Sequence, residues 1–141
     1  MTKLFIDSDA ILDHLSERDP FRKDAARLFS LLENQKLTGF TSPLVFANLH
    51  YILRKTNTKE EAIIHLRKLR LVLGILPLTQ EMIDRSLRSE FSDFEDSIQH
   101  EAALAGRINF IITRNEKDYR KSRVVVFTPR EFVSFWQATS R

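Results

Sequence analysis

Short apolar runs alternate along the chain with longer stretches in which apolar residues recur every three or four positions. The predicted strands cover residues 4–6, 37–41, 75–78, 110–112 and 124–127. Runs this short, several of them rich in β-branched residues, are typical of strands buried inside a sheet. The periodic stretches between them are typical of amphipathic helices. The alternation predicts an α/β fold with a parallel central sheet flanked by helices.

Residues that start or stop helices separate these segments. The predicted start signals are Asp19-Pro20, Ser42-Pro43, Thr58 with Glu61, Thr79, Ser92 with Glu95, and Thr128-Pro129. In each, a side-chain oxygen can accept a free backbone N–H of the first turn, or a proline stands at the first helical position. Gly106 is expected to end the helix that opens at Asp93. Because no linker or repeat interrupts residues 1–141, we expect a single domain.

Composition narrows the class of protein. The chain has 141 residues, of which 43% are hydrophobic and 29% charged, an ordinary globular balance. No apolar run approaches the roughly 20 residues that span a bilayer, and the N-terminus has no signal-peptide pattern. The sequence has no cysteine, which excludes disulfides, zinc–thiolate sites and thiol nucleophiles and fits a cytoplasmic protein.

The first candidate for chemistry is an acidic residue at the end of the first predicted strand. Asp7 follows the apolar run 4–6 directly, and Asp9 comes two residues later. The carboxyl ends of parallel strands form the edge at which α/β sheets bind ligands. A carboxylate buried there needs a hydrogen bond, a proton or a metal ion. Capping of the next helix by Asp9 is the structural alternative for this segment.

Two further acidic segments are expected near the same edge. Asp93, Glu95 and Asp96 fall in the first turn of a helix if Ser92 is its cap, and helix-dipole stabilisation alone accounts for the first two. Asn115 and Asp118 follow the strand 110–112. Oxygen ligands without sulfur suit Mg²⁺ or Mn²⁺, which can lower the pKa of a bound water and clamp a phosphoryl group. The residues therefore predict a metal-dependent enzyme acting on phosphate esters.

With these residues in place, the chain resembles the PIN domain, the fold of the VapC-type toxin ribonucleases. The similarity runs through residues 5–9, 42–51, 93–99 and 113–119. Its most specific parts are Asp-Phe-Glu-Asp at the start of the third segment and Thr-Arg-Asn at the start of the fourth.

The resemblance implies an acidic groove that binds Mg²⁺ or Mn²⁺ and hydrolysis of single-stranded RNA by a metal-activated water. It also implies two protein partners, an antitoxin that occupies the groove and a second copy that forms a homodimer. Asp7 and Asp96 match metal-binding aspartates of the family. Asn115 and Asn48 stand where many members have an aspartate and a glutamate, and we interpret these amides as the signature of a branch.

The resemblance and the residues together give a predicted site. Asp7, Asp96 and Asn115 form its catalytic group, and Asp93 and Asp118 are further candidate metal ligands. The basic stretch 114–123 lies beside these acids in the sequence, where a polyanion needs neutralising. The candidates for contacts with the RNA backbone are Arg114, Lys117 and Lys121.

Two other functions compete with this prediction. A PIN-like module whose acidic site is weakened by Asn48 and Asn115 could bind RNA or a protein partner without cutting. The Asp7-Ser8-Asp9 pattern also resembles the nucleophile motif of haloacid dehalogenase-like phosphatases. That family needs a later Gly-Asp motif, and none of the three glycines of this chain precedes an aspartate.

Overall fold

A computed structural model describes residues 1–139 of the chain and has the expected α/β architecture. The strands are β1 (Lys3–Ile6), β2 (Thr38–Thr41), β3 (Leu73–Ile75), β4 (Phe110–Ile112) and β5 (Val125–Phe127). The helices are α1 (Ser8–Leu15), α2 (Arg22–Glu33), α3 (Pro43–Leu53), α4 (Lys59–Val72), α5 (Gln80–Leu87), α6 (Phe94–Ala105), the 3₁₀ turn η1 (Glu116–Tyr119) and α7 (Pro129–Thr139).

The five strands form one parallel sheet in the order β3-β2-β1-β4-β5. At its centre, Phe5 of β1 is paired with Phe40 of β2 on one side and with Ile111 of β4 on the other. Leu4, Phe5 and Ile6 are all fully buried, so both faces of the central strand are covered. This explains why β1 is a continuous apolar run with no polar alternation.

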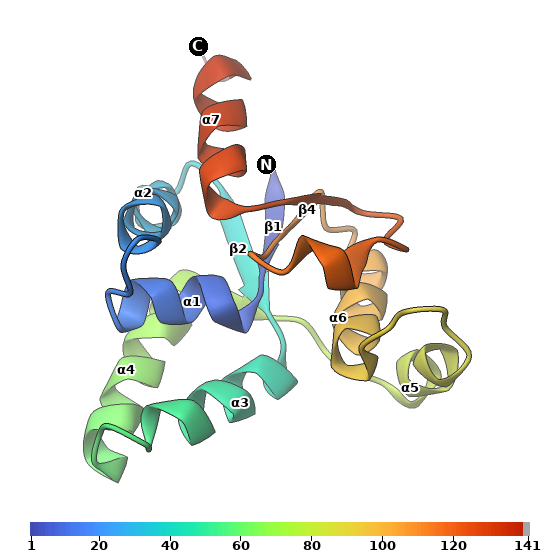
Figure 1. Cartoon of the computed structure of the whole chain (residues 1–141), viewed down its shortest axis with the longest axis horizontal. Coiled ribbons are helices and arrows are strands. Elements are labelled where there is room, and N and C mark those ends of the chain that lie inside the picture. The colour runs from blue at the N-terminus through green and yellow to red at the C-terminus, as the bar shows by residue number, and fades with distance from the viewer. Residues whose placement is uncertain (140–141) are drawn as a thin grey trace.

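The helices cover the sheet from two sides (Figure 1). In that view α1, α2, α3 and α4 lie to one side of the strands, and α5, α6 and η1 lie to the other. The last helix, α7, packs against α2 and carries Phe132 into the core. Within residues 1–139, no helix combines the length and the apolar character that crossing a bilayer requires.

Most helices begin where the sequence predicts, because side-chain caps determine these starts. Ser42 Oγ accepts the Val45 N–H at 3.1 Å, and Pro43 opens α3. Thr58 and Glu61 form a reciprocal capping box at the start of α4. Thr79 caps α5 by accepting the Met82 N–H at 3.3 Å. These three starts depend on contacts within four residues, which explains why the pattern alone locates them.

Three predicted boundaries were wrong. Helix α2 begins at Arg22 and not at Pro20, because Phe21 N–H donates to the Arg18 carbonyl at 2.9 Å and closes a turn first. The strand expected over residues 75–78 is β3 at Leu73–Ile75, since its backbone pairs with β2 as soon as α4 ends. The cap of α6 is Asp93, not Ser92: its Oδ1 accepts the Asp96 N–H at 2.9 Å.

Candidate active site

Two strands deliver polar side chains to the carboxyl edge of the sheet, at the point where the strand order changes direction. The chain moves outward from β1 to β2 and β3, whereas β4 returns to the opposite side of β1. Asp7 follows β1 and donates its N–H to the Ile112 carbonyl of β4 at 2.9 Å. Thr113 follows β4 and donates its N–H to the Phe127 carbonyl at 3.0 Å. Such a switch point is where open α/β sheets bind their ligands.

Asp7 is held in a fixed orientation at this point. It is the N-cap of α1, and its Oδ1 accepts the Ser8 N–H at 2.8 Å. Its Oδ2 accepts the hydroxyls of Thr113 and Tyr119, each at 3.2 Å. Burial, followed by the charge of Asp9, raises the pKa of Asp7 to about 6 in spite of these donors. The carboxyl group is therefore desolvated and oriented, as a metal ligand or a proton acceptor must be.

Three more carboxylates meet beside Asp7. Asp93, Asp96 and Asp118 each place a carboxylate oxygen within 4.8 Å of the others, although they come from the start of α6 and from η1. Burial raises the pKa of Asp96 to about 8, and the charges of Asp7, Asp93 and Asp118 add to the rise. The cluster concentrates negative charge in a partly desolvated place, an arrangement that a bound cation relieves.

The donor set fits a hard divalent cation. All candidate ligands are carboxylate or amide oxygens, and the carboxylates of the cluster are close enough to share one ion. Oxygen-only sets of this kind suit Mg²⁺ and Mn²⁺. Asp93, Asp96 and Asp118 are the residues that would hold the ion, with Asp7 beside them.

The two asparagines at this edge have different contacts. Asn115 donates its amide to Asp118 Oδ2, and its backbone N–H to Thr113 Oγ1 at 3.1 Å. It thereby ties one carboxylate of the cluster to the end of β4. Asn48 of α3 donates its amide to Glu95 Oε2 of α6 at 3.1 Å. Asn48 therefore joins two helices and brings Glu95 into the surroundings of the site.

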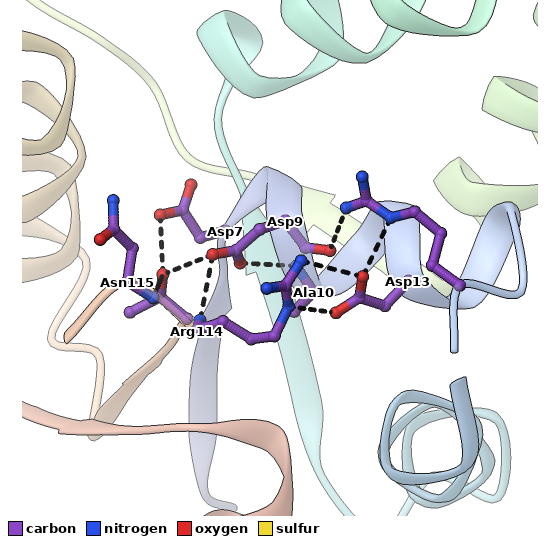
Figure 2. Close-up of polar contacts among 8 residues, drawn as sticks. Asp7, Asp9, Ala10, Asp13, Arg114 and Asn115 are labelled. Atoms are coloured by element: carbon purple, nitrogen blue, oxygen red, sulfur yellow. Dashed lines mark hydrogen bonds and ion pairs between the residues drawn. The ribbon is translucent and has the colours of Figure 1, made fainter. Parts of the chain in front are cut away.

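A second acidic group lies next to the first but is fully paired (Figure 2). Asp13 of α1 accepts Arg114 Nε at 2.6 Å, Arg114 Nη2 at 3.2 Å and Arg18 Nε at 3.1 Å. Asp9 Oδ2 accepts the Arg114 N–H at 3.1 Å and the Thr113 hydroxyl at 3.2 Å. The Arg114 guanidinium also lies over the Phe21 ring, 3.8 Å from its centroid. These contacts fix the turn that carries Thr113 and Asn115.

A family model described as "PIN domain" matches residues 3–117. The chain belongs to the PIN domain family. The match includes the strand end at Asp7, the start of α6 and the Thr-Arg-Asn turn.

Proteins similar to this chain include a ribonuclease and a chain of a toxin–antitoxin complex. Ribonuclease VapC1 of Aquifex aeolicus is 24% identical over 139 residues, covering 95% of each chain. A toxin–antitoxin complex from Klebsiella pneumoniae contains a chain with TM-score 0.68 and 24% identity, covering 91% of this chain and 98% of that one. VapBC2 from Rickettsia felis, bound to a DNA fragment from its promoter, gives TM-score 0.67 at 16% identity, with coverage of 90% and 98%. The fold is that of a VapC-like PIN domain.

The basic residues predicted to contact RNA separate into two groups in this PIN domain. The Arg114 side chain is engaged with Asp13 and Phe21, so its contacts give it a structural role. Lys117 and Lys121 are exposed and line a hollow beside Asp118. Of the three predicted RNA contacts, Lys117 and Lys121 are placed to meet a ligand of the acidic cluster.

Sequence reasoning missed several residues of the site. Thr113 bridges Asp7 and Asp9, and Tyr119 donates to Asp7, yet neither received a role. A signal existed for both, since one directly follows an apolar strand and the other directly follows Asp118. Asp13 was missed although it is a charged residue among the buried positions of α1. A charge on an apolar helix face predicts a buried partner.

Proposed function

We propose that this PIN domain is a ribonuclease that cuts single-stranded RNA with the help of Mg²⁺ or Mn²⁺. It would be the toxin of a toxin–antitoxin pair acting in the cytoplasm. The observation that carries the proposal is the meeting of Asp93, Asp96 and Asp118 within 4.8 Å, beside Asp7 at the switch point of the sheet. The name of its relative VapC1, a ribonuclease, supports the choice of RNA as substrate.

The proposed roles follow from the contacts of each side chain. Asp93, Asp96 and Asp118 are the proposed metal ligands of the cluster, and Asp7, which matches a metal-binding aspartate of the family, completes the set. Asn115 holds Asp118 in place through its amide. When bound, a divalent cation supplies acidification of water and neutralises charge that develops at the scissile phosphate. Lys117 and Lys121 bind the phosphates that flank the cut.

Cleavage of a mixed pool of single-stranded RNA tests the proposal. Wild type should cut in Mg²⁺ or Mn²⁺ and not in EDTA. Asp96→Asn should lower the rate by about 100-fold or more, because it removes a carboxylate from the charge-stabilising site. Asp84→Asn, an exposed aspartate on α5, is the matched control and should cut like wild type. Equal rates for Asp96→Asn and wild type would contradict the assignment.

A second candidate function is RNA or partner binding without cleavage. The hydrogen bond of Asn48 to Glu95 favours it, because this position of α3 contributes an amide and no carboxylate to the site. The same experiment separates the two functions. A folded wild-type protein that binds the RNA pool and leaves it intact with either metal would establish the binding module.

The proposal also includes two protein partners. The toxin–antitoxin complex from Klebsiella pneumoniae supports an antitoxin that covers the acidic residues. A homodimer is the assembly that the family resemblance implies. Sedimentation of the purified protein with and without a co-expressed antitoxin tests both. A chain that stays monomeric, and forms no complex when co-expressed, would remove this part of the proposal.

A further inference from the structure

A hollow beside the acidic cluster is lined by Lys117, Asp118 and Lys121 and by four residues that have no role in the proposed function. Its volume is about 350 Å³, which lies at the lower end of the range for small-molecule pockets. It is lined on one side by the loop before α6 and on the other by η1 and the residues that follow. The lining residues are Glu90, Phe91, Ser92, Lys117, Asp118, Arg120 and Lys121. Because Asp118 belongs to both, the hollow adjoins the cluster directly.

The charges of the hollow favour an anion. Lys117, Arg120 and Lys121 outnumber Glu90 and Asp118 around it. Lys121 contacts Glu90 at 3.7 Å, but both side chains are more than half exposed, so the pair is weak and easily exchanged. Within residues 1–139, the side chains of Lys117 and Arg120 make no hydrogen bond or ion pair. A phosphate group can therefore recruit both without breaking an internal contact.

The aromatic ring of the hollow is linked to the acidic residues. Phe91 meets Tyr119 edge to face, with ring centroids 5.9 Å apart, and packs at 4.8 Å from the ring of His100. Tyr119 in turn donates its hydroxyl to Asp7. These contacts hold Phe91 at a fixed place between the cations and the site. Proteins bind nucleotides with this combination of groups: an aromatic ring stacks on the base, and cationic side chains bind the phosphate.

We propose that this hollow binds one nucleotide of the RNA next to the scissile phosphate. Its base stacks on Phe91, and its phosphate is bound by Lys117 and Arg120. The inference rests on the proposed ribonuclease function and deepens it, because a nucleotide held here fixes which phosphate of the strand reaches Asp96. Phe91 then contributes to substrate preference, since stacking strength differs among the bases.

Binding of ribonucleoside 5′-monophosphates to the wild-type protein in EDTA tests the inference without any cleavage. Chemical-shift titration with AMP, GMP, CMP and UMP is compared with ribose 5-phosphate, which lacks a base. Phe91→Leu should weaken the binding of the nucleotides by about fivefold or more, which is the lower bound for losing one base–aromatic stack. The affinity for ribose 5-phosphate should stay unchanged. Arg120→Ala should weaken both kinds of probe. Phe91→Tyr should restore nucleotide binding.

A matched control is Phe94→Leu, an exposed aromatic near the hollow that does not line it. It should bind all probes like wild type. Equal affinity of Phe91→Leu and wild type for nucleotides, or equal affinity of wild type for nucleotides and ribose 5-phosphate, would overturn the inference. A protein that cuts RNA but fails these tests keeps its proposed function and loses only the nucleotide site. A protein that passes them but does not cut keeps the site and loses the nuclease.

Discussion

Two groups of aspartates lie at the same edge of the sheet, and their surroundings are opposite. Asp13 is fully buried and faces two guanidinium groups, with Arg114 Nε at 2.6 Å and Arg18 Nε at 3.1 Å. Asp96 is half-buried and faces the like charges of Asp7, Asp93 and Asp118. Within residues 1–139, no lysine or arginine forms an ion pair with Asp7, Asp93, Asp96 or Asp118.

The difference shows that a buried carboxylate is not by itself a sign of function. Asp13 has its counter-charges inside the chain, so its network is complete as it stands. The group around Asp96 has carboxylates without a protein cation, and its balance requires protons or a metal ion. Thr113 joins the two, because its hydroxyl lies 3.2 Å from both Asp7 Oδ2 and Asp9 Oδ2. The paired network of Asp13 and Asp9 thus helps to position the carboxylates around Asp96, which have no protein cation as a partner.

Breaking the paired group should give the largest change in stability. Asp13→Ala removes the shared partner of Arg114 and Arg18 and leaves their charges uncompensated. We expect the free energy of unfolding to fall by about 3–5 kcal/mol, the usual result of removing one partner of a buried ion pair. Urea unfolding followed by circular dichroism measures the change.

Asp19→Ala is the matched control for this prediction. Its ion pair with Arg22 spans 2.9 Å, but the Asp19 side chain is 74% exposed. Such surface pairs contribute about 0–1 kcal/mol. A loss in Asp13→Ala no larger than the loss in Asp19→Ala would show that the buried network contributes little.

The unpaired group should make the metal-free protein less stable as pH rises. Burial raises the pKa of Asp96 from its ordinary value of 3.8 to about 8 in the folded chain, so the folded state binds more protons between these values. Stability therefore falls as pH rises through this window and levels off above pH 8. Asp96→Asn lacks this titration. Above pH 8 its free energy of unfolding should therefore exceed that of wild type by about 1 kcal/mol, a figure discounted for solvent screening.

Thermal unfolding in EDTA at several pH values between 4 and 9 measures this second prediction. The melting temperature of wild type should decline relative to Asp96→Asn across the window. Adding Mn²⁺ should reverse the order, because the ion replaces the proton on the carboxylate. If the melting temperatures of the two proteins in EDTA changed with pH in parallel, the pKa of Asp96 would not be raised in the folded chain.

The smallest expected change in stability comes from Phe21, which contacts the paired group through Arg114. Phe21 is 37% exposed, and the Arg114 guanidinium lies 3.8 Å from its ring centroid. Phe21→Leu should lower the free energy of unfolding by about 0.5–1 kcal/mol through loss of this cation–π contact. Denaturation in the Arg114→Met background, which removes the positive charge, provides the check. An equal loss from Phe21→Leu in both backgrounds would mean that the contact with the guanidinium contributes nothing.

The parallel arrangement of strands and most helix starts could be predicted from the sequence. The carboxyl ends of β1, β2, β4 and β5, the parallel sheet and the caps at Ser42, Thr58 and Thr79 follow from periodicity and from contacts within one helical turn. Asp7 and Asp118 follow parallel strands that end at one edge, and Asp96 stands in the first turn of α6, where it meets Asp118. The cap of α6 was misassigned because Ser92 and Asp93 can both accept a helical N–H.

What the sequence could not reveal are contacts between distant residues. Arg114 and Asp13 are 101 positions apart, and nothing in either local pattern connects them. Arg114 was therefore predicted to bind RNA, as a basic residue next to acidic ones, whereas its guanidinium is paired inside the chain. Asn48 and Glu95 are 47 positions apart and present the same difficulty. Side-chain partners of this kind depend on how helices pack, which local periodicity does not specify.

The most direct test of this contrast is the binding of Mn²⁺ measured by calorimetry at pH 7.5 for wild type, Asp96→Asn and Asp13→Asn. Wild type should bind the ion, Asp96→Asn should bind at least about tenfold more weakly, and folded Asp13→Asn should bind like wild type. The absence of binding in wild type, or equal affinity in Asp96→Asn, would contradict the assignment of a metal centre. A loss in Asp13→Asn as large as the loss in Asp96→Asn would contradict the separation of the two groups.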